Sequence, residues 1–198
     1  MKQQLVEDVR RRTRAAQHVS SYPLLAVGVL LLNYGVVGFS GVGFSGRPVE
    51  WRYAAALVFV ALWALGKASE TSSGLGAPRG DYLVAAAGVF ALTQLTLMDP
   101  VVSWLGFFRL QGVWVAIVGL GLLAVARARE ERGLLGWALL VCVAGAAVAI
   151  ANYSHLASVH EGPRVVVMLG NQNVPVALLG LVLTIAGVVT YERERREG

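Results

Sequence analysis

Six apolar runs, separated by short charged connections, dominate this sequence of 198 residues. The runs cover residues 22–44, 53–65, 82–98, 101–126, 134–151 and 174–191. A helix rises about 1.5 Å per residue, so roughly 20 apolar residues cross the hydrocarbon core of a bilayer, which is about 30 Å thick. Only 15% of the residues are charged, whereas soluble domains carry roughly 25%. We therefore expect an all-α chain of six transmembrane helices in the cell membrane, with the lipid bilayer as its main partner.

Two of the runs do not match the length of one span. The second run is short, but extending it to residues 51–68 gives about 27 Å of helix, with Arg52 and Lys67 at its ends, where long basic side chains reach the membrane interface. The fourth run is too long. Counting back about 27 Å from its end places Arg109 at the opposite boundary of the membrane. Residues 101–108 are then expected to form a separate interfacial segment that holds aromatic rings at headgroup depth.

The basic residues are divided unequally between the two sides that six spans create. One side holds Arg10, Arg11, Arg12, Arg14, Lys67, Arg79, Arg127, Arg129, Arg132, Arg193, Arg195 and Arg196. The other side holds Arg47, Arg52, Arg109 and Arg164. Because positive residues are retained on the cytoplasmic side, the first set is assigned to the cytoplasm. This assignment requires an even number of spans and predicts that both termini are cytoplasmic.

Three segments follow from this topology. Residues 1–21 form a basic cytoplasmic segment in which apolar and arginine positions fall on opposite sides of a helical projection. That pattern is typical of an interfacial amphipathic helix, and a solvated basic tail is the alternative. Residues 22–191 form the transmembrane domain, and residues 192–198 form a charged cytoplasmic tail. No connection between the runs is long enough to fold as a soluble domain.

Several functional classes are disfavoured by composition. The net charge of +5 is spread over short segments between apolar runs, which favours membrane orientation over nucleic-acid binding. A single cysteine, Cys142, excludes a disulfide or a thiolate cluster within the chain. No span holds a lysine in its middle for a Schiff base or a histidine pair for haem, and the common hydrolase and phosphate-binding motifs are missing. We expect no cofactor, and catalysis is a minority interpretation.

Polar side chains gather in the predicted outer halves of the spans, and the inner halves are almost wholly apolar. The candidates are Asn33, Gln94, Asp99, Arg109, Asn152, His155 and Asn173. An unpaired polar side chain is costly in a bilayer, so a cluster on one side favours a function. The hypothesis is an outward-facing component that binds or transports a small polar solute. The structural alternative reads Asn33 and Gln94 as interhelical hydrogen bonds, Asp99 and Arg109 as a boundary ion pair, and Asn173 as a helix cap.

Two other functions remain open. The glycine-rich spans and the lack of a soluble module favour a non-catalytic subunit or scaffold that packs on another membrane protein or on a second copy of itself. A membrane enzyme acting at the outer face would use His155, His160 and Asp99. His155 and His160 are the weak candidates for a metal site, and no metal is expected, because their spacing of five does not place two ligands on one helical face.

Overall fold

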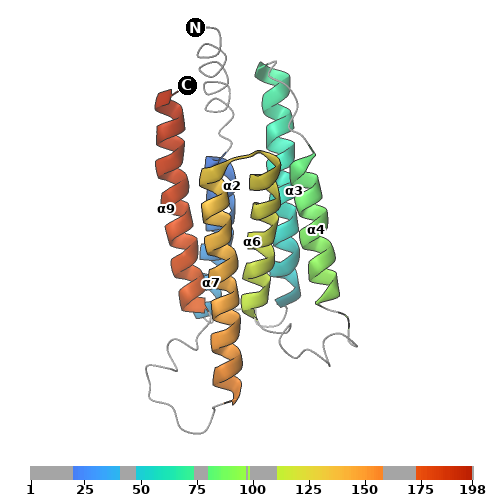
Figure 1. Cartoon of the computed structure of the whole chain (residues 1–198), viewed down its shortest axis with the longest axis vertical. Helices are drawn as coiled ribbons and strands as arrows, with labels where there is room; N and C mark the ends of the chain where they lie inside the picture. Colours follow the sequence, from blue (N-terminus) through green and yellow to red (C-terminus); the bar gives the residue numbers. More distant parts are fainter. Residues whose placement is uncertain are drawn as a thin grey trace.

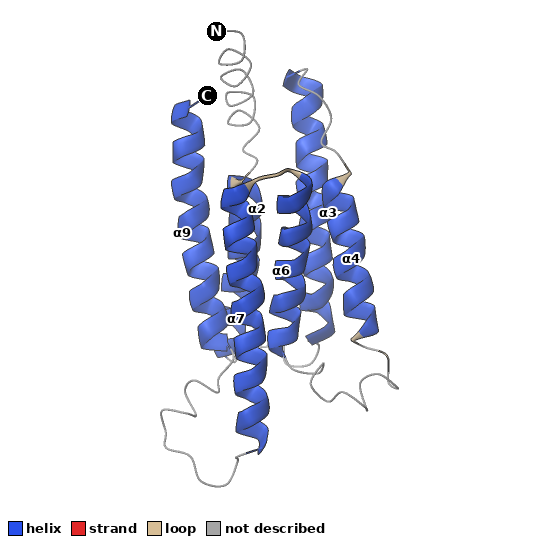
Figure 2. Cartoon of the chain, in the orientation of Figure 1, coloured by secondary structure: helices blue, strands red, loops and turns tan. Residues whose placement is uncertain are grey.

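The computed structural model describes residues 20–40, 48–73, 80–96, 98, 111–157 and 173–197. This part of the chain forms six α-helices and no strand (Figures 1 and 2). The helices are α2 (Ser21–Ser40), α3 (Pro48–Ser73), α4 (Asp81–Leu95), α6 (Gln111–Ala128), α7 (Arg132–Ala157) and α9 (Asn173–Glu197). The predicted all-α class with six helices is confirmed. The predicted N-terminal interfacial helix and the segment 101–108 lie outside the described residues.

The six helices differ in apolar length. Two are long and apolar enough to cross a membrane, by length and composition: α7 over Arg132–Ile150 and α9 over Val174–Arg196. The other four hold shorter apolar segments, at Ser21–Val36, Tyr53–Ala68, Asp81–Leu95 and Gly112–Ala128. Helix α4 is the shortest, and its 15 residues rise about 22 Å. It ends before the predicted run does, at a cap where the Thr96 hydroxyl donates a hydrogen bond to the carbonyl of Thr93 (2.7 Å).

The helices are arranged as a closed ring of antiparallel neighbours (Figure 1). Helix α2 packs on α9 and α3, α3 on α4, α4 on α6, α6 on α7, and α7 on α9. The contacts of α2 with α9 and of α6 with α7 are the most extensive. We call the end of the bundle where α2 begins and α9 ends the proximal end, and the opposite end the distal end. Because neighbours alternate in direction, α3, α6 and α9 begin at the distal end.

Glycines bring α2 and α9 into close contact. They lie seven residues apart on each helix, at Gly28 and Gly35 on α2 and at Gly180 and Gly187 on α9. A Cβ atom added to Gly35 would lie 2.5 Å from the backbone nitrogen of Ala177, and one added to Gly180 would meet the backbone of Leu32. A repeat of seven keeps one face of a helix directed at its partner over several turns. The two backbones therefore pack directly on each other at these points.

Helices α6 and α7 pack in the same way. Gly112 and Gly119 on α6 are again seven residues apart, and Gly145 on α7 lies opposite the stretch between them. A Cβ atom at Gly119 would lie 2.7 Å from the backbone nitrogen of Cys142, and one at Gly145 would meet the backbone of Ala116. These contacts also define the antiparallel register. From Gly119 to Gly112 on α6, the partner on α7 moves from Cys142 to Ala149, seven residues on each helix.

The connection between α6 and α7 is a tight turn. The N–H of Glu131 donates to the carbonyl of Ala126 (3.0 Å), and the N–H of Glu130 donates to the carbonyl of Arg127 (3.2 Å). Glu130 has a φ of 56° and is the one non-glycine residue of the described chain with a positive φ. These bonds and this conformation define a Schellman motif, in which the left-handed residue is most often glycine. Because the turn is short, α6 and α7 are in contact from the point where they are connected.

The α3·α4 pair is packed by side chains. The rings of Tyr53 on α3 and Phe90 on α4 have centroids 5.9 Å apart, and Phe59 is fully buried. Gly88 on α4 faces open space, since a Cβ atom added to it would have no neighbouring atom within 4 Å. The bundle is therefore made of two glycine-lined helix pairs and one pair whose described contacts are made by large side chains.

Candidate functional site

A hydrogen bond between two helices lies in the distal half of the bundle. The side-chain amide of Gln94 on α4 donates to the hydroxyl oxygen of Tyr53 on α3 at 2.9 Å. Both residues are partly buried, and the Tyr53 ring also packs on Phe90. Gln94 thus makes an interhelical hydrogen bond, as expected from the structural alternative to a solute-binding role. Its carbonyl oxygen and the second N–H of the amide retain further hydrogen-bonding capacity.

An aromatic pair crosses the middle of the ring at the same end. The Trp114 side chain on α6 packs against Tyr34 on α2, with ring centroids 4.8 Å apart and an interplanar angle of 45°. Trp114 is 4% exposed and Tyr34 is 8% exposed. The indole Nε1 of Trp114 is buried and has no hydrogen-bond partner among the described residues. An indole N–H is a donor only, so a buried one that lacks an acceptor is destabilising.

A second buried polar atom without a partner in the described part of the chain lies on α4. Other described threonine hydroxyls donate to helix carbonyls, as in Thr184 to Gly180 (2.8 Å) and Thr190 to Ala186 (2.7 Å). Thr93 is 1% exposed, yet its Oγ1 has no hydrogen-bond partner among the described residues. The usual local solution for a helical threonine, a bond to the preceding turn, is therefore not used at Thr93.

The register of α4 against α6 places these two atoms at similar depth. Near the proximal end, Arg129 pairs with Asp81, and in the middle a Cβ atom at Gly121 would lie 2.7 Å from the side chain of Val89. Seven residues further toward the distal end, α6 reaches Trp114 from Gly121 and α4 reaches Thr96 from Val89. Trp114 and Thr96 therefore lie at the same depth. Thr93 is three residues from Thr96, which is about 4.5 Å along the axis. The two unpaired polar atoms therefore lie within about one helical turn of each other in depth.

Asn33 takes a different position from the other predicted site residues. It is exposed on α2, on the side that also exposes Val29 (52%) and Val36 (53%). The opposite side of α2 holds Gly28 and Gly35 against α9. The structure therefore does not bring Asn33 together with Gln94 in the centre of the bundle.

The remaining predicted site residues lie at the distal end or outside the described chain. Asn152 and His155 fall in the last turns of α7, and Asn173 is the first residue of α9. These backbone positions share the distal end with Gln94 (Figure 1), and their side chains are not described. Asp99, Arg109 and His160 lie outside the described residues. Within the described part of the chain, no group of three or more His, Cys, Asp or Glu side chains is arranged to hold a metal ion.

The proximal end carries the charged contacts. The Arg129 side chain lies over the Tyr82 ring, 4.3 Å from its centroid, and its Nε is 3.7 Å from Asp81 Oδ2. At that distance the two charges attract each other without a hydrogen bond. The carboxylate of Glu194 on α9 accepts bonds from the Ser21 hydroxyl (2.6 Å) and the Ser20 N–H (3.2 Å). A carboxylate stabilises the start of a helix, so the hydrogen bonds of Glu194 connect the beginning of α2 to the end of α9.

Trp114 and Tyr53 are not among the residues predicted from the sequence. Tryptophan in membrane proteins is most common near the headgroups, at the ends of apolar runs. Trp114 instead lies beyond Arg109, which the sequence places at the membrane boundary, and so falls inside the span. Its burial depends on packing against Tyr34 of α2, a helix far away in sequence. No protein-family model matches this chain, and comparisons with curated proteins and with solved structures find no match.

Proposed function

We propose that this chain is an integral membrane protein with six transmembrane helices and cytoplasmic termini, and that it binds a small uncharged polar solute in the outer half of the bundle. The membrane location is supported by the surface of the helices. Away from the charged residues of the proximal end, among them Lys67, the described exposed positions between the helix ends are Ala, Gly, Val, Leu, Ile and Phe, with Asn33 as the one polar exception. Such a surface suits hydrocarbon and not water.

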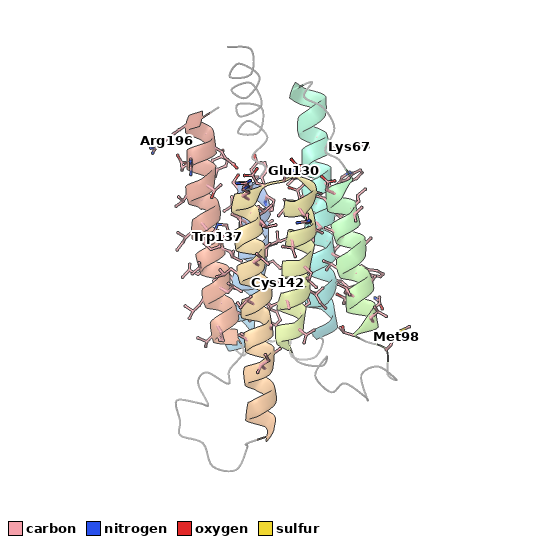
Figure 3. All side chains as sticks on the ribbon, in the orientation of Figure 1. Lys67, Met98, Glu130, Trp137, Cys142 and Arg196 are labelled. Atoms are coloured by element: carbon pink, nitrogen blue, oxygen red, sulfur yellow. The ribbon has the colours of Figure 1, made fainter. Side chains whose placement is uncertain are left out.

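The orientation is supported by the distribution of charge. The basic side chains that the structure describes lie at the proximal end: Lys67, Arg127, Arg129, Arg132, Arg193, Arg195 and Arg196. Figure 3 labels Lys67, Glu130 and Arg196 at this end and Met98 at the other. Since basic residues are retained in the cytoplasm, the proximal end is the cytoplasmic one and the distal half of the bundle faces outward.

One observation supports the solute site: two buried atoms, Trp114 Nε1 and Thr93 Oγ1, have no hydrogen-bond partner among the described residues. A buried donor without an acceptor costs about 1–3 kcal/mol, so a ligand atom that pairs with it is bound favourably. The indole requires an acceptor, and the threonine hydroxyl offers both a donor and an acceptor. Neither group is charged. A solute with a hydroxyl, carbonyl or amide oxygen, such as glycerol or urea, fits this chemistry better than an ion does.

A membrane subunit or scaffold is the second candidate. It is favoured by Asn33, whose polar side chain lies on an outward face that is otherwise apolar. Polar groups on a lipid-facing surface are costly unless another polypeptide pairs with them.

Membrane location and orientation are tested by labelling. With Cys142 replaced by alanine, the variants Met98→Cys and Arg196→Cys each carry one thiol, at opposite ends of the bundle. We expect a membrane-impermeant maleimide to label Met98→Cys on intact cells, and to label Arg196→Cys only after lysis. Labelling of both thiols on intact cells, or release of the protein from membranes by alkaline carbonate, would refute this part of the proposal.

The solute site is tested in vesicles that contain the purified protein. Entry of glycerol and of urea is measured by light scattering after an osmotic step, and binding by equilibrium dialysis of the labelled solutes. We expect Trp114→Phe and Thr93→Val each to reduce the signal several-fold, as the loss of one hydrogen bond predicts. Trp137→Phe, at a partly exposed tryptophan on α7, is the matched control and should leave it unchanged. A wild-type signal equal to that of empty vesicles overturns the site.

A further inference from the structure

The exposed face of α2 has the spacing of a coiled-coil seam. Its positions are Tyr22, Ala26, Val29, Asn33 and Val36, at successive intervals of four, three, four and three residues. Tyr22 is 40% exposed, Val29 52% and Val36 53%, Asn33 is exposed, and Ala26 is partly exposed. This alternation is the a and d pattern by which two helices pack along their length. In that pattern Asn33 occupies an a position.

The composition of the other exposed faces makes this seam distinctive. Helix α9 exposes a wide surface that is wholly apolar between its ends, at Leu178, Leu181, Val182, Ile185, Val188 and Val189. Helices α4 and α7 likewise expose only apolar or glycine positions between their described ends. Those faces are suited to lipid as they stand. Asn33 lies about 18 Å from the start of α2, in the middle of a membrane about 30 Å thick, where lipid offers it no hydrogen bond.

We propose that this seam is the interface of a homodimer, in which the α2 helices of two copies run parallel and their Asn33 side chains hydrogen-bond to each other. The proposal depends on the membrane location proposed above and not on the solute site. All copies of a chain insert with the same orientation, so a two-fold axis along the membrane normal brings each α2 residue opposite its own copy. A second copy therefore always presents a carboxamide at the required depth.

The chemistry of asparagine fits this partner. A carboxamide carries both an acceptor oxygen and donor N–H groups, so two identical side chains satisfy each other. A single asparagine at an a position is also the residue type that fixes the register and the number of strands in parallel coiled helices. Val29 and Val36 lie on either side of Asn33 and supply the apolar part of the seam. The α2·α9 packing is left intact, because Gly28 and Gly35 face the other way.

Disulfide cross-linking in native membranes tests the interface. In a Cys142→Ala background, Val29→Cys and Val36→Cys place thiols on the seam, and Val143→Cys places one on the exposed face of α7, where Val143 is 68% exposed. Under mild oxidation we expect dimers of the full chain from the first two variants and none from the third. Cross-linking of all three variants, of none, or of the seam thiols to a different polypeptide overturns the homodimer.

The role of Asn33 is tested by energy transfer between labelled copies in vesicles. We expect Asn33→Val to weaken association about tenfold, as the loss of a hydrogen bond between membrane helices predicts, and Asn33→Gln to retain part of it. Undiminished association of Asn33→Val overturns the proposed pairing. Failure of the membrane location is distinguished separately, because a chain that alkaline carbonate extracts refutes both proposals, whereas a membrane-retained chain that does not cross-link refutes the dimer alone.

Discussion

Two helix pairs of this bundle, α2·α9 and α3·α4, are held together by different contacts. In α2·α9, glycines at every seventh position let one backbone lie directly on the other. In α3·α4, the Tyr53 ring packs on Phe90, Phe59 is fully buried, and Gly88 takes no part. In the proposed membrane location, helices gain little from burying apolar surface, because lipid is equally apolar, so close van der Waals packing and polar bonds decide their association. The comparison teaches that the two pairs should differ in their tolerance of one added methyl group.

The largest effect is expected for Gly180→Ala. The new methyl group would meet the backbone of Leu32, which cannot move aside without shifting α2. We expect the free energy of unfolding to fall by about 2–3 kcal/mol, the usual upper range for overpacking. The measurement is denaturation by SDS in mild-detergent micelles, followed by circular dichroism. Gly88→Ala is the control, and it should be neutral or stabilise by up to about 1 kcal/mol, because alanine is the better helix former. Equal effects at the two sites would contradict the distinction between the pairs.

A smaller effect is expected for Gly121→Ala, where α6 meets the side-chain-packed pair. The added methyl group would lie 2.7 Å from a methyl group of Val89 and 2.8 Å from the Phe59 ring. Both neighbours are ends of side chains, which rotate more readily than a backbone moves. We expect a loss of about 1–2 kcal/mol in the same denaturation experiment. A loss as large as that of Gly180→Ala would show that backbone and side-chain neighbours are equally rigid in this bundle.

The polar part of the α3·α4 contact is measured by a double-mutant cycle. Gln94→Leu and Tyr53→Phe each remove one partner of the 2.9 Å hydrogen bond. We expect a coupling free energy of about 0.6 kcal/mol, with an upper limit near 1.7, which is the range found for hydrogen bonds between membrane helices. A coupling free energy of zero would mean that aromatic packing alone holds α3 to α4. The Tyr53→Phe variant retains the ring contact with Phe90, so the cycle isolates the hydrogen bond.

The number and type of helices could be predicted from the apolar runs, and the rotation of each helix could not. Helix α2 is apolar on nearly every side, so its sequence gives no amphipathic pattern to indicate which face turns inward. The outer-half clustering of polar residues predicts Asn33 beside Gln94, whereas the structure places Asn33 on the exposed face of α2. The glycines at positions 28 and 35 do indicate close packing, but their partners on α9 are known only from the fold. The isolation of Trp114 Nε1 likewise depends on neighbours from other helices.

The smallest effect is expected at the turn of the second glycine-lined pair, α6·α7. Glu130 has a φ of 56°, a conformation that glycine adopts without steric cost and that other residues adopt with strain. Glu130→Gly should therefore stabilise the protein, by only about 0.5 kcal/mol, because glycine also loses more chain entropy on folding. Glu131→Gly is the control, since position 131 lacks a positive φ and glycine there should be neutral or destabilising. If Glu130→Gly lowered the free energy of unfolding instead, the Glu130 side chain would be contributing more at this turn than its backbone strain costs.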